Sequence, residues 1–127
     1  MTWQAQRARL SDRADASCEI CGRYRASNGH HRKNRSQGGD HRLSNLLLLC
    51  GSGTTGCHGW VTEHPAEAKR NGWAVWPTDD PASVPVLYRT HWVRLDDEGN
   101  CHLLQKGSIR NALGHLHIAD DITAESG

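Results

Sequence analysis

Four of the five cysteines are spaced as two pairs that could bind a metal ion. Cys18 and Cys21 are separated by two residues, and Cys50 and Cys57 by six. Zinc binds four thiolates in a closed tetrahedron, and a C-x2-C turn presents two sulfurs on one side. The pattern therefore predicts a structural Zn²⁺ site. A redox C-x-x-C pair and buried free thiols are the alternatives, and Cys101 is expected to be a small apolar residue in a strand.

The loop inside the second cysteine pair raises the question of nucleotide binding. Residues 51–56, GSGTTG, follow four leucines and have the G-x-x-x-x-G form of a phosphate-binding loop. Such a loop requires Lys and then Ser or Thr directly after its second glycine, and this chain has Cys57 and His58 there. The sequence therefore argues against an ATP or GTP site.

Three histidines and one asparagine could supply hydrolytic chemistry. His30 and His31 lie between the cysteine pairs, Asn45 follows fourteen residues after His31, and His58 directly follows the last paired cysteine. Successive side chains of a strand point to opposite faces, so the neighbouring histidines are expected to have different roles. One could bind a metal ion together with His58 while the other faces the substrate. A neutral imidazole with a pKa near ~6.5 is a workable general base at pH 7.

In this order, the segments CEIC, HHR, GGD, SNLLLLC and CHGW resemble the HNH endonuclease family in its cysteine-rich ββα-metal form. The resemblance covers residues 18 to about 64, and similarity to small phage-encoded HNH proteins continues to roughly residue 95. It implies metal-dependent hydrolysis of DNA phosphodiester bonds. By position, His31 corresponds to the general base and Asn45 to the asparagine that braces the adjacent loop. His30 and His58 correspond to the ligands of one divalent catalytic metal.

The identity of that catalytic metal is left open. Position 30 is often Asp in the family, and imidazole ligands favour Zn²⁺, Ni²⁺, Mn²⁺ or Co²⁺ over Mg²⁺ more than carboxylates do. The candidates are Mg²⁺, Mn²⁺, Ni²⁺ and Zn²⁺. His64, six residues after His58, is expected to have a capping role, with a third metal ligand as the alternative. His41 is expected to be a solvated loop histidine.

Positive charge is concentrated in the first half of the chain. Residues 1–64 contain nine Lys/Arg against five Asp/Glu, and residues 65–127 contain six against nine. This asymmetry weakly favours an anionic partner for the first half. The residues predicted to contact the DNA backbone are Arg32, Lys33, Arg35 and Arg42. A zinc-stapled DNA-binding or packaging accessory module without catalysis is the alternative function, and the likeness to phage proteins implies a terminase as a further partner.

The elements that must position these residues are short. A helix is predicted over residues 2–15 with Thr2 as its N-cap, and strands are predicted over residues 28–33 and 46–49. Two short helices should follow, one from residue 57 to about 63 and one over 65–70. Further strands are predicted over 73–76, 85–95 and 101–105, the last two forming a hairpin around DDEGN.

The composition favours one small domain stabilised by a metal. The chain has 127 residues, 36% of them hydrophobic, and no Phe. The expected fold is α+β, with a ββα-metal core stapled by the four cysteines and a C-terminal β-hairpin extension. The predicted divisions are an N-terminal helix (1–17), a nuclease core (18–76), a β extension (77–107) and a partly disordered tail (108–127). The four tryptophans expected to fill the core are Trp60, Trp73, Trp76 and Trp92.

The expected compartment follows from the absence of long apolar segments. The first fifteen residues are charged and helical in pattern, unlike a signal peptide. The run of four leucines is far too short to span a membrane. We therefore expect no membrane association and a cytoplasmic location, in the host cytoplasm if the protein is phage-encoded, where thiols stay reduced. The sequence does not predict the oligomeric state.

Overall fold

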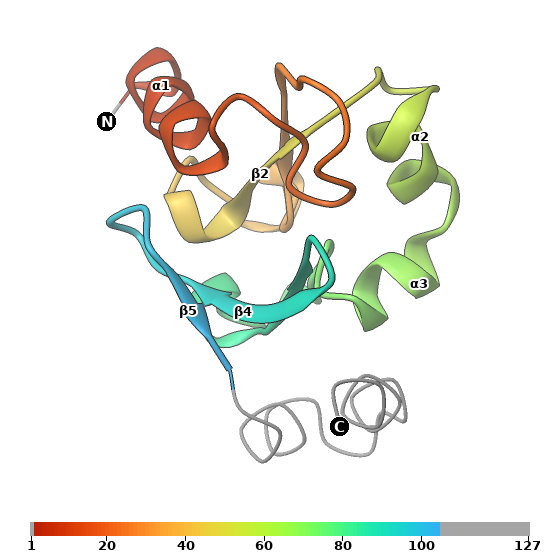
Figure 1. Ribbon diagram of the computed structural model, residues 1–127. Helices are drawn as coiled ribbons and strands as arrows, with labels where there is room; N and C mark the ends of the chain where they lie inside the picture. The colour runs from red at the N-terminus through yellow and green to blue at the C-terminus, as the bar shows by residue number, and fades with distance from the viewer. Residues whose placement is uncertain (1, 105–127) are drawn as a thin grey trace.

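The computed structural model describes residues 2–104 and confirms the α+β class (Figure 1). The first part of the chain forms α1 (Trp3–Ala14), β1 (Asn28–His31), the 3-10 turns η1 (Arg35–Gln37) and η2 (Leu43–Asn45), and β2 (Leu46–Leu49). The second part forms α2 (Gly56–Glu63), α3 (Pro65–Arg70), η3 (Pro81–Ser83), β3 (Val86–Tyr88), β4 (His91–Leu95) and β5 (Cys101–Leu103). The predicted tail at 108–127 lies outside the described residues. No helix within residues 2–104 is long and apolar enough to cross a membrane.

Helix α1 begins and ends with local capping interactions. The hydroxyl of Thr2 accepts a hydrogen bond from the backbone N–H of Ala5 at 3.1 Å, as expected of an N-cap. Asp15 follows the helix in the left-handed conformation, with φ of 55°. The buried residues Gln6, Leu10 and Ala14 recur every four positions, so one face of the helix packs inward.

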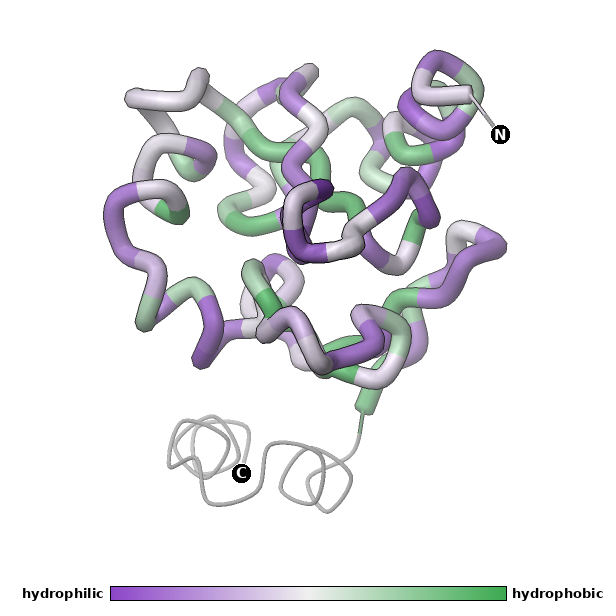
Figure 2. Tube along the Cα trace, turned by 180° about the vertical axis from the view of Figure 1, so that it is seen from behind, coloured by the Kyte–Doolittle hydropathy of each residue, from purple (hydrophilic) through white to green (hydrophobic). Residues whose placement is uncertain are grey.

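Strand β2 runs through the centre of the molecule and is buried on both faces. Leu47 and Leu49 belong to an apolar cluster with residues of α2 and α3, whereas Leu46 and Leu48 pack with Leu10 of α1. This division follows from the two-residue period of a strand. Helices lie on both sides of β2 (Figure 1), so each of its four residues must be apolar. Figure 2 shows the hydrophobic segments of the chain gathered toward the interior.

Strand β1 pairs with β2 in an antiparallel hairpin that sets the direction of the two histidines. His31 is opposite Leu46 and His30 is opposite Leu47. His31 therefore lies on the α1 side of the hairpin and His30 on the α2 side. The strand ends at His31, two residues before the predicted end.

Two predicted strands in the C-terminal part are wrong. Residues 73–76 form no strand, because the N–H groups of Trp73 and Ala74 bind the carbonyl of Ala68 at the end of α3. The predicted strand 85–95 is two strands, because Arg89 and Thr90 have positive φ values of 48° and 76° and reverse the chain. The hairpin around DDEGN is confirmed, with β4 paired to β5 and β3 on its other side.

The four tryptophans that were expected in the core divide equally between the core and the surface. Trp73 and Trp92 are buried, whereas Trp60 and Trp76 are 40% and 58% exposed. The expectation that all four fill the core is therefore wrong for two of them. Trp60 instead stacks on His64, and the ammonium of Lys69 lies 3.7 Å from the ring centroid of Trp76.

Candidate active site and metal centres

The four paired cysteines converge on one point, although they come from three separate segments. The sulfurs of Cys18, Cys21, Cys50 and Cys57 all lie within 4.8 Å of one another, and those of Cys21 and Cys50 are 3.9 Å apart. All four are free thiols. Sulfurs bound to one zinc at about 2.3 Å in a tetrahedron are about 3.8 Å apart, so this cluster is positioned to bind a metal ion.

Backbone N–H groups of the two cysteine loops favour negative charge on the sulfurs. The N–H of Arg23 lies 3.5 Å from the sulfur of Cys21, and the N–H of Cys57 lies 3.5 Å from the sulfur of Cys50. Burial opposes ionisation of Cys18, but backbone N–H groups outweigh it and lower its pKa to about 7. Burial raises the pKa of Cys57, and the nearby thiolate of Cys18 adds to that effect. Ionisation of one sulfur therefore raises the pKa of its neighbour, and a bound cation would offset this repulsion between thiolates.

A buried ion pair fixes the first cysteine loop to the rest of the fold. Glu19, between Cys18 and Cys21, accepts hydrogen bonds from the guanidinium of Arg13 at 2.8 and 2.9 Å. It also accepts one from the N–H of Leu48, while Arg13 donates to the carbonyls of η2 and β2. Because both charges are buried and multiply hydrogen-bonded, the pair ties α1, the cysteine loop and β2 together.

His30 on β1 and His58 on α2 face each other. Their ring centroids are 5.7 Å apart with an interplanar angle of 64°, close enough for one ion to be bound by both. Nε2 of His30 lies 2.7 Å from the carbonyl oxygen of Trp73. A carbonyl only accepts, so Nε2 carries the proton and Nδ1 of the neutral ring has a free lone pair. Metal-binding histidines are usually held in this way.

The environment of this pair fits a metal ion. Nδ1 of His58 is buried and has no hydrogen-bond partner within the described residues. Burial lowers the pKa of His30 to about 4, and the nearby charges of His58 and His31 add to this effect, so the ring is neutral at pH 7. A neutral imidazole and an unpartnered imidazole nitrogen are the donors that a divalent transition metal prefers.

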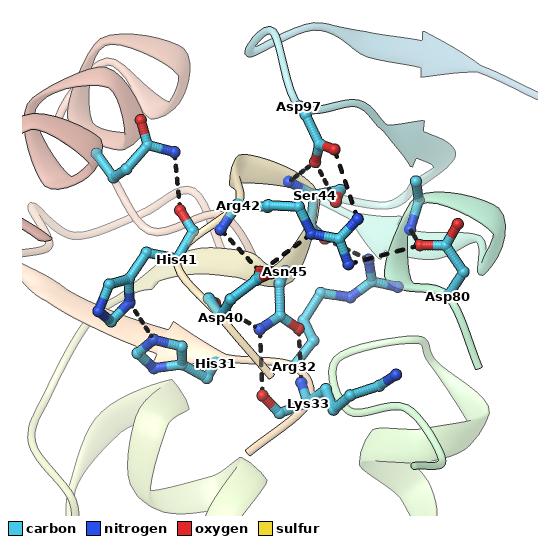
Figure 3. Close-up of polar contacts among 12 residues, drawn as sticks. His31, Arg32, Lys33, Asp40, His41, Arg42, Ser44, Asn45, Asp80 and Asp97 are labelled. Atoms are coloured by element: carbon cyan, nitrogen blue, oxygen red, sulfur yellow. Dashed lines mark hydrogen bonds and ion pairs between the residues drawn. The ribbon is translucent and has the colours of Figure 1, made fainter. Parts of the chain in front are cut away.

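His31 lies on the opposite face of β1, against α1. Its ring stacks on Trp3 with centroids 5.5 Å apart and an interplanar angle of 26°. Its Nε2 lies 3.0 Å from Nδ1 of His41 (Figure 3). Burial, followed by the charges of His41 and Arg35, lowers the pKa of His31 below its usual value. The ring is therefore neutral and able to accept a proton at pH 7.

Asn45 is buried and holds the loop that follows β1 (Figure 3). Its side-chain oxygen accepts a hydrogen bond from the N–H of Lys33 at 2.7 Å. Its amide group donates to the carbonyls of Lys33 and Asp40 at 3.1 and 2.8 Å. Its backbone carbonyl accepts from the N–H of Arg32. The Asn45 side chain therefore links the two ends of the loop from residue 33 to residue 40, which follows His31 in the chain.

His30, His31 and His58 line one cleft of about 350 Å³. Its walls come from β1, the loop after β1, α2, α3 and residues 74–75. Residues 18–59 match the family model described as HNH endonuclease. The chain contains an HNH endonuclease domain. Neither a curated protein nor a solved structure gives a significant match.

The matched segment holds both candidate metal sites and half of the residues that line the cleft. The four cysteines, the three cleft histidines and Asn45 all fall inside the HNH domain. Helix α1, helix α3 and the C-terminal sheet lie outside it. The roles of the cleft residues in catalysis stay predictions.

Arg32 does not belong to the predicted DNA-contacting set. Its side chain is buried, with 2% exposed, and its guanidinium donates to the carbonyls of Gly72, Ser44, Pro81 and Val84 at 2.7 to 2.9 Å. Every nitrogen of the guanidinium is therefore occupied, and no phosphate can approach it. We correct the prediction: Arg32 joins the HNH domain to the segment that precedes β3.

The other three predicted DNA contacts lie at the surface in different surroundings. Arg35 is exposed and Lys33 is half-buried at the edge of the cleft loop. Arg42 forms ion pairs with Asp40, Asp80 and Asp97 at 3.0, 3.9 and 3.7 Å (Figure 3). Because three carboxylates surround it, Arg42 is the least suited of the three to bind phosphate.

Two histidines outside the predicted catalytic set have definite positions. His64 hydrogen-bonds through Nδ1 to the carbonyl of Trp60 at 2.8 Å, so it closes the end of α2. His41 is half-buried between His31 and Trp3, which corrects the expectation of a solvated loop histidine. Nothing in the spacing of Trp3, His31 and His41 along the sequence indicated that they meet.

Proposed function

We propose that the protein is a metal-dependent HNH endonuclease that hydrolyses phosphodiester bonds of DNA. The observation that carries the proposal is the placement of three imidazoles in one cleft. His30 and the unpartnered His58 form a pair suited to one ion, and His31 lines the same cleft from the other face of β1, with its pKa lowered by burial. A zinc-binding module without catalysis has no need of such an arrangement.

In the proposed reaction, the base is His31. Its ring takes a proton from a water molecule, whose oxygen forms a bond to phosphorus as the bond from phosphorus to the 3′-oxygen breaks. The leaving 3′-oxygen then takes up a proton from solvent. Asn45 keeps the loop behind the base in place. Lys33 and Arg35 are proposed to contact the phosphates on either side, which gives affinity without sequence preference.

A divalent ion bound by His30 and His58 would neutralise the phosphate oxygens and support the leaving group. Mg²⁺, Mn²⁺, Ni²⁺ and Zn²⁺ are the candidates, and two imidazole ligands favour the transition metals. We propose Zn²⁺ in the four-cysteine cluster, because four thiolates at these separations suit zinc. That ion has a structural role, since four protein sulfurs leave no open position for substrate.

The biological setting belongs to the same proposal. The resemblance to small phage-encoded HNH proteins supports DNA processing or packaging, with a terminase as partner, in the host cytoplasm. The competing function is a zinc-stapled accessory module that binds DNA without cutting it. The four-cysteine cluster alone would serve that function equally well.

A plasmid-nicking assay separates the two functions. Supercoiled plasmid is incubated with wild type, His31→Ala and His91→Ala in Mg²⁺, Mn²⁺, Ni²⁺ or Zn²⁺. His91 is exposed on β4 and serves as a matched control. We expect nicking by wild type and the control, and a loss on the order of 10²–10⁴-fold in His31→Ala. Equal nicking by all three folded proteins, or none with any metal, would support the accessory module instead.

A further inference from the structure

Three aromatic rings from two separate segments form a compact cluster on the α1 side of the hairpin. Trp3 lies 5.5 Å from His31 and 5.0 Å from His41 between ring centroids, and the two imidazoles are 5.1 Å apart. The imidazoles are joined by a hydrogen bond of 3.0 Å between Nε2 of His31 and Nδ1 of His41 (Figure 3). Each ring therefore limits the side-chain rotation of the other two.

Helix α1 supplies the fixed part of this cluster. Trp3 occupies the space that a side chain at position 29 would fill, since a Cβ there would lie 2.4 Å from the indole ring. Gly29 is two residues before His31, on the same face of β1. The side-chain amide of Gln6 also donates to the backbone carbonyl of His41 at 2.8 Å. Both helix residues lie outside the matched HNH segment.

The hydrogen bond between the imidazoles has two arrangements with opposite consequences. If His31 donates from Nε2, the lone pair of its neutral ring is on Nδ1 and can accept a proton from water. If His41 donates from Nδ1, the lone pair of His31 is on Nε2 and is occupied by His41. Only the first arrangement leaves His31 able to act as a base.

We propose that His41 is a positioning residue that selects the Nε2-protonated tautomer of His31 and holds its ring in the cleft, with Trp3 as the supporting wall. This inference rests on the proposed function, in which His31 is the base. His41 acts through His31 and touches neither the substrate nor the ion. The site of hydrolysis therefore includes the loop after β1 and the first turn of α1.

The experiment compares His41→Ala with His41→Asn. The Asn side chain places an oxygen near the position of imidazole Nδ1 and can still accept from His31, whereas Ala cannot. The tautomer of His31 is measured by long-range ¹H–¹⁵N correlation NMR, and nicking is measured with kcat and KM separated. Both variants are also made in the His31→Ala background. His91→Ala is again the control.

We expect wild type and His41→Asn to hold His31 mainly as the Nε2-protonated tautomer, and His41→Ala to show a mixture. We expect kcat to fall about 10- to 100-fold in His41→Ala, as for other residues that orient a functional histidine, with KM little changed and partial recovery in His41→Asn. In the His31→Ala background the same change should cost nothing further. An unchanged tautomer in His41→Ala would overturn the inference, and so would a loss of kcat that persists without His31. If wild type proves inactive, the proposed function fails while the tautomer measurement still decides whether His41 sets the state of His31.

Discussion

Cys57 and His58 are consecutive residues in the first turn of α2, and their side chains serve two different centres. The sulfur of Cys57 completes the four-cysteine cluster, and the ring of His58 lines the cleft opposite His30. The N–H of His58 also donates to the carbonyl of Cys50 at 3.1 Å. The start of the helix thus packs against the cysteine cluster, so a metal ion bound there would also fix the position of His58.

The first prediction concerns the four-cysteine cluster. We expect about one tightly bound zinc per chain, lost in Cys21→Ser together with the fold, because structural zinc contributes about 10–16 kcal/mol, as much as a small domain's whole stability. Zinc content by mass spectrometry and thermal unfolding by circular dichroism provide the measurement. Cys101→Ser is the matched control, since Cys101 is exposed and outside the cluster. A Cys21→Ser protein that stays folded without zinc would contradict the structural role.

The second prediction compares metal binding by two histidines, His58 in α2 and His64 at the C-terminal end of that helix. His58→Ala should abolish binding of Mn²⁺ or Ni²⁺ at the cleft, because it removes one of two proposed ligands. His64→Ala should retain binding, because the His64 ring stacks on Trp60 and is not among the residues that line the cleft. Isothermal titration calorimetry on zinc-loaded protein measures both. Weaker binding in His64→Ala than in His58→Ala would reverse the assignment of the ligands.

The third prediction contrasts a buried arginine with an exposed one. Arg32→Gln should lower the free energy of unfolding by about 3–5 kcal/mol, because several buried carbonyls lose a charged donor. Arg35→Gln should leave unfolding unchanged and weaken DNA binding, with the slope of log affinity against log salt reduced by about 0.9. Urea denaturation and fluorescence anisotropy at several salt concentrations test the pair. A stable Arg32→Gln protein with a reduced salt slope would restore Arg32 as a phosphate contact.

The fourth prediction concerns the amide group of Asn45. In Asn45→Asp one oxygen still accepts from Lys33, but the other replaces a donor that faces two carbonyl oxygens. We expect stability to fall by at least about 1–3 kcal/mol at pH 7 and amide exchange across residues 33–40 to become faster. Hydrogen-exchange mass spectrometry reports the loop directly. Unchanged exchange in this segment would show that the loop is held by other contacts.

The sequence predicted those parts of the fold that depend on local patterns. The capping of α1 by Thr2, the strand of four leucines and the helix after Cys57 follow from short-range rules, and the structure contains all three. The cysteine cluster was predicted because metal coordination demands a particular spacing. The division of residues 85–95 was missed, since Arg89 and Thr90 are not typical residues for a turn with positive φ.

Long-range polar contacts could not be predicted in the same way. Arginine is rarely buried, so the sequence predicts Arg32 at the surface, yet carbonyls up to fifty-two residues away accept its hydrogen bonds. The polar loop around His41 likewise predicts an exposed side chain, whereas its ring packs against Trp3 and its backbone carbonyl accepts from Gln6. In both cases the partner that decides the role comes from a distant part of the chain, and no periodicity in the sequence indicates it.

The burial of Arg32 limits how this domain can be transplanted. Of the four carbonyls that receive its guanidinium, only that of Ser44 lies within residues 18–59. A graft made from that stretch alone would leave a cation in the interior with three of its acceptors missing. Anyone who moves this HNH domain into a chimera must carry the chain at least as far as Val84, together with the helix that holds Trp3.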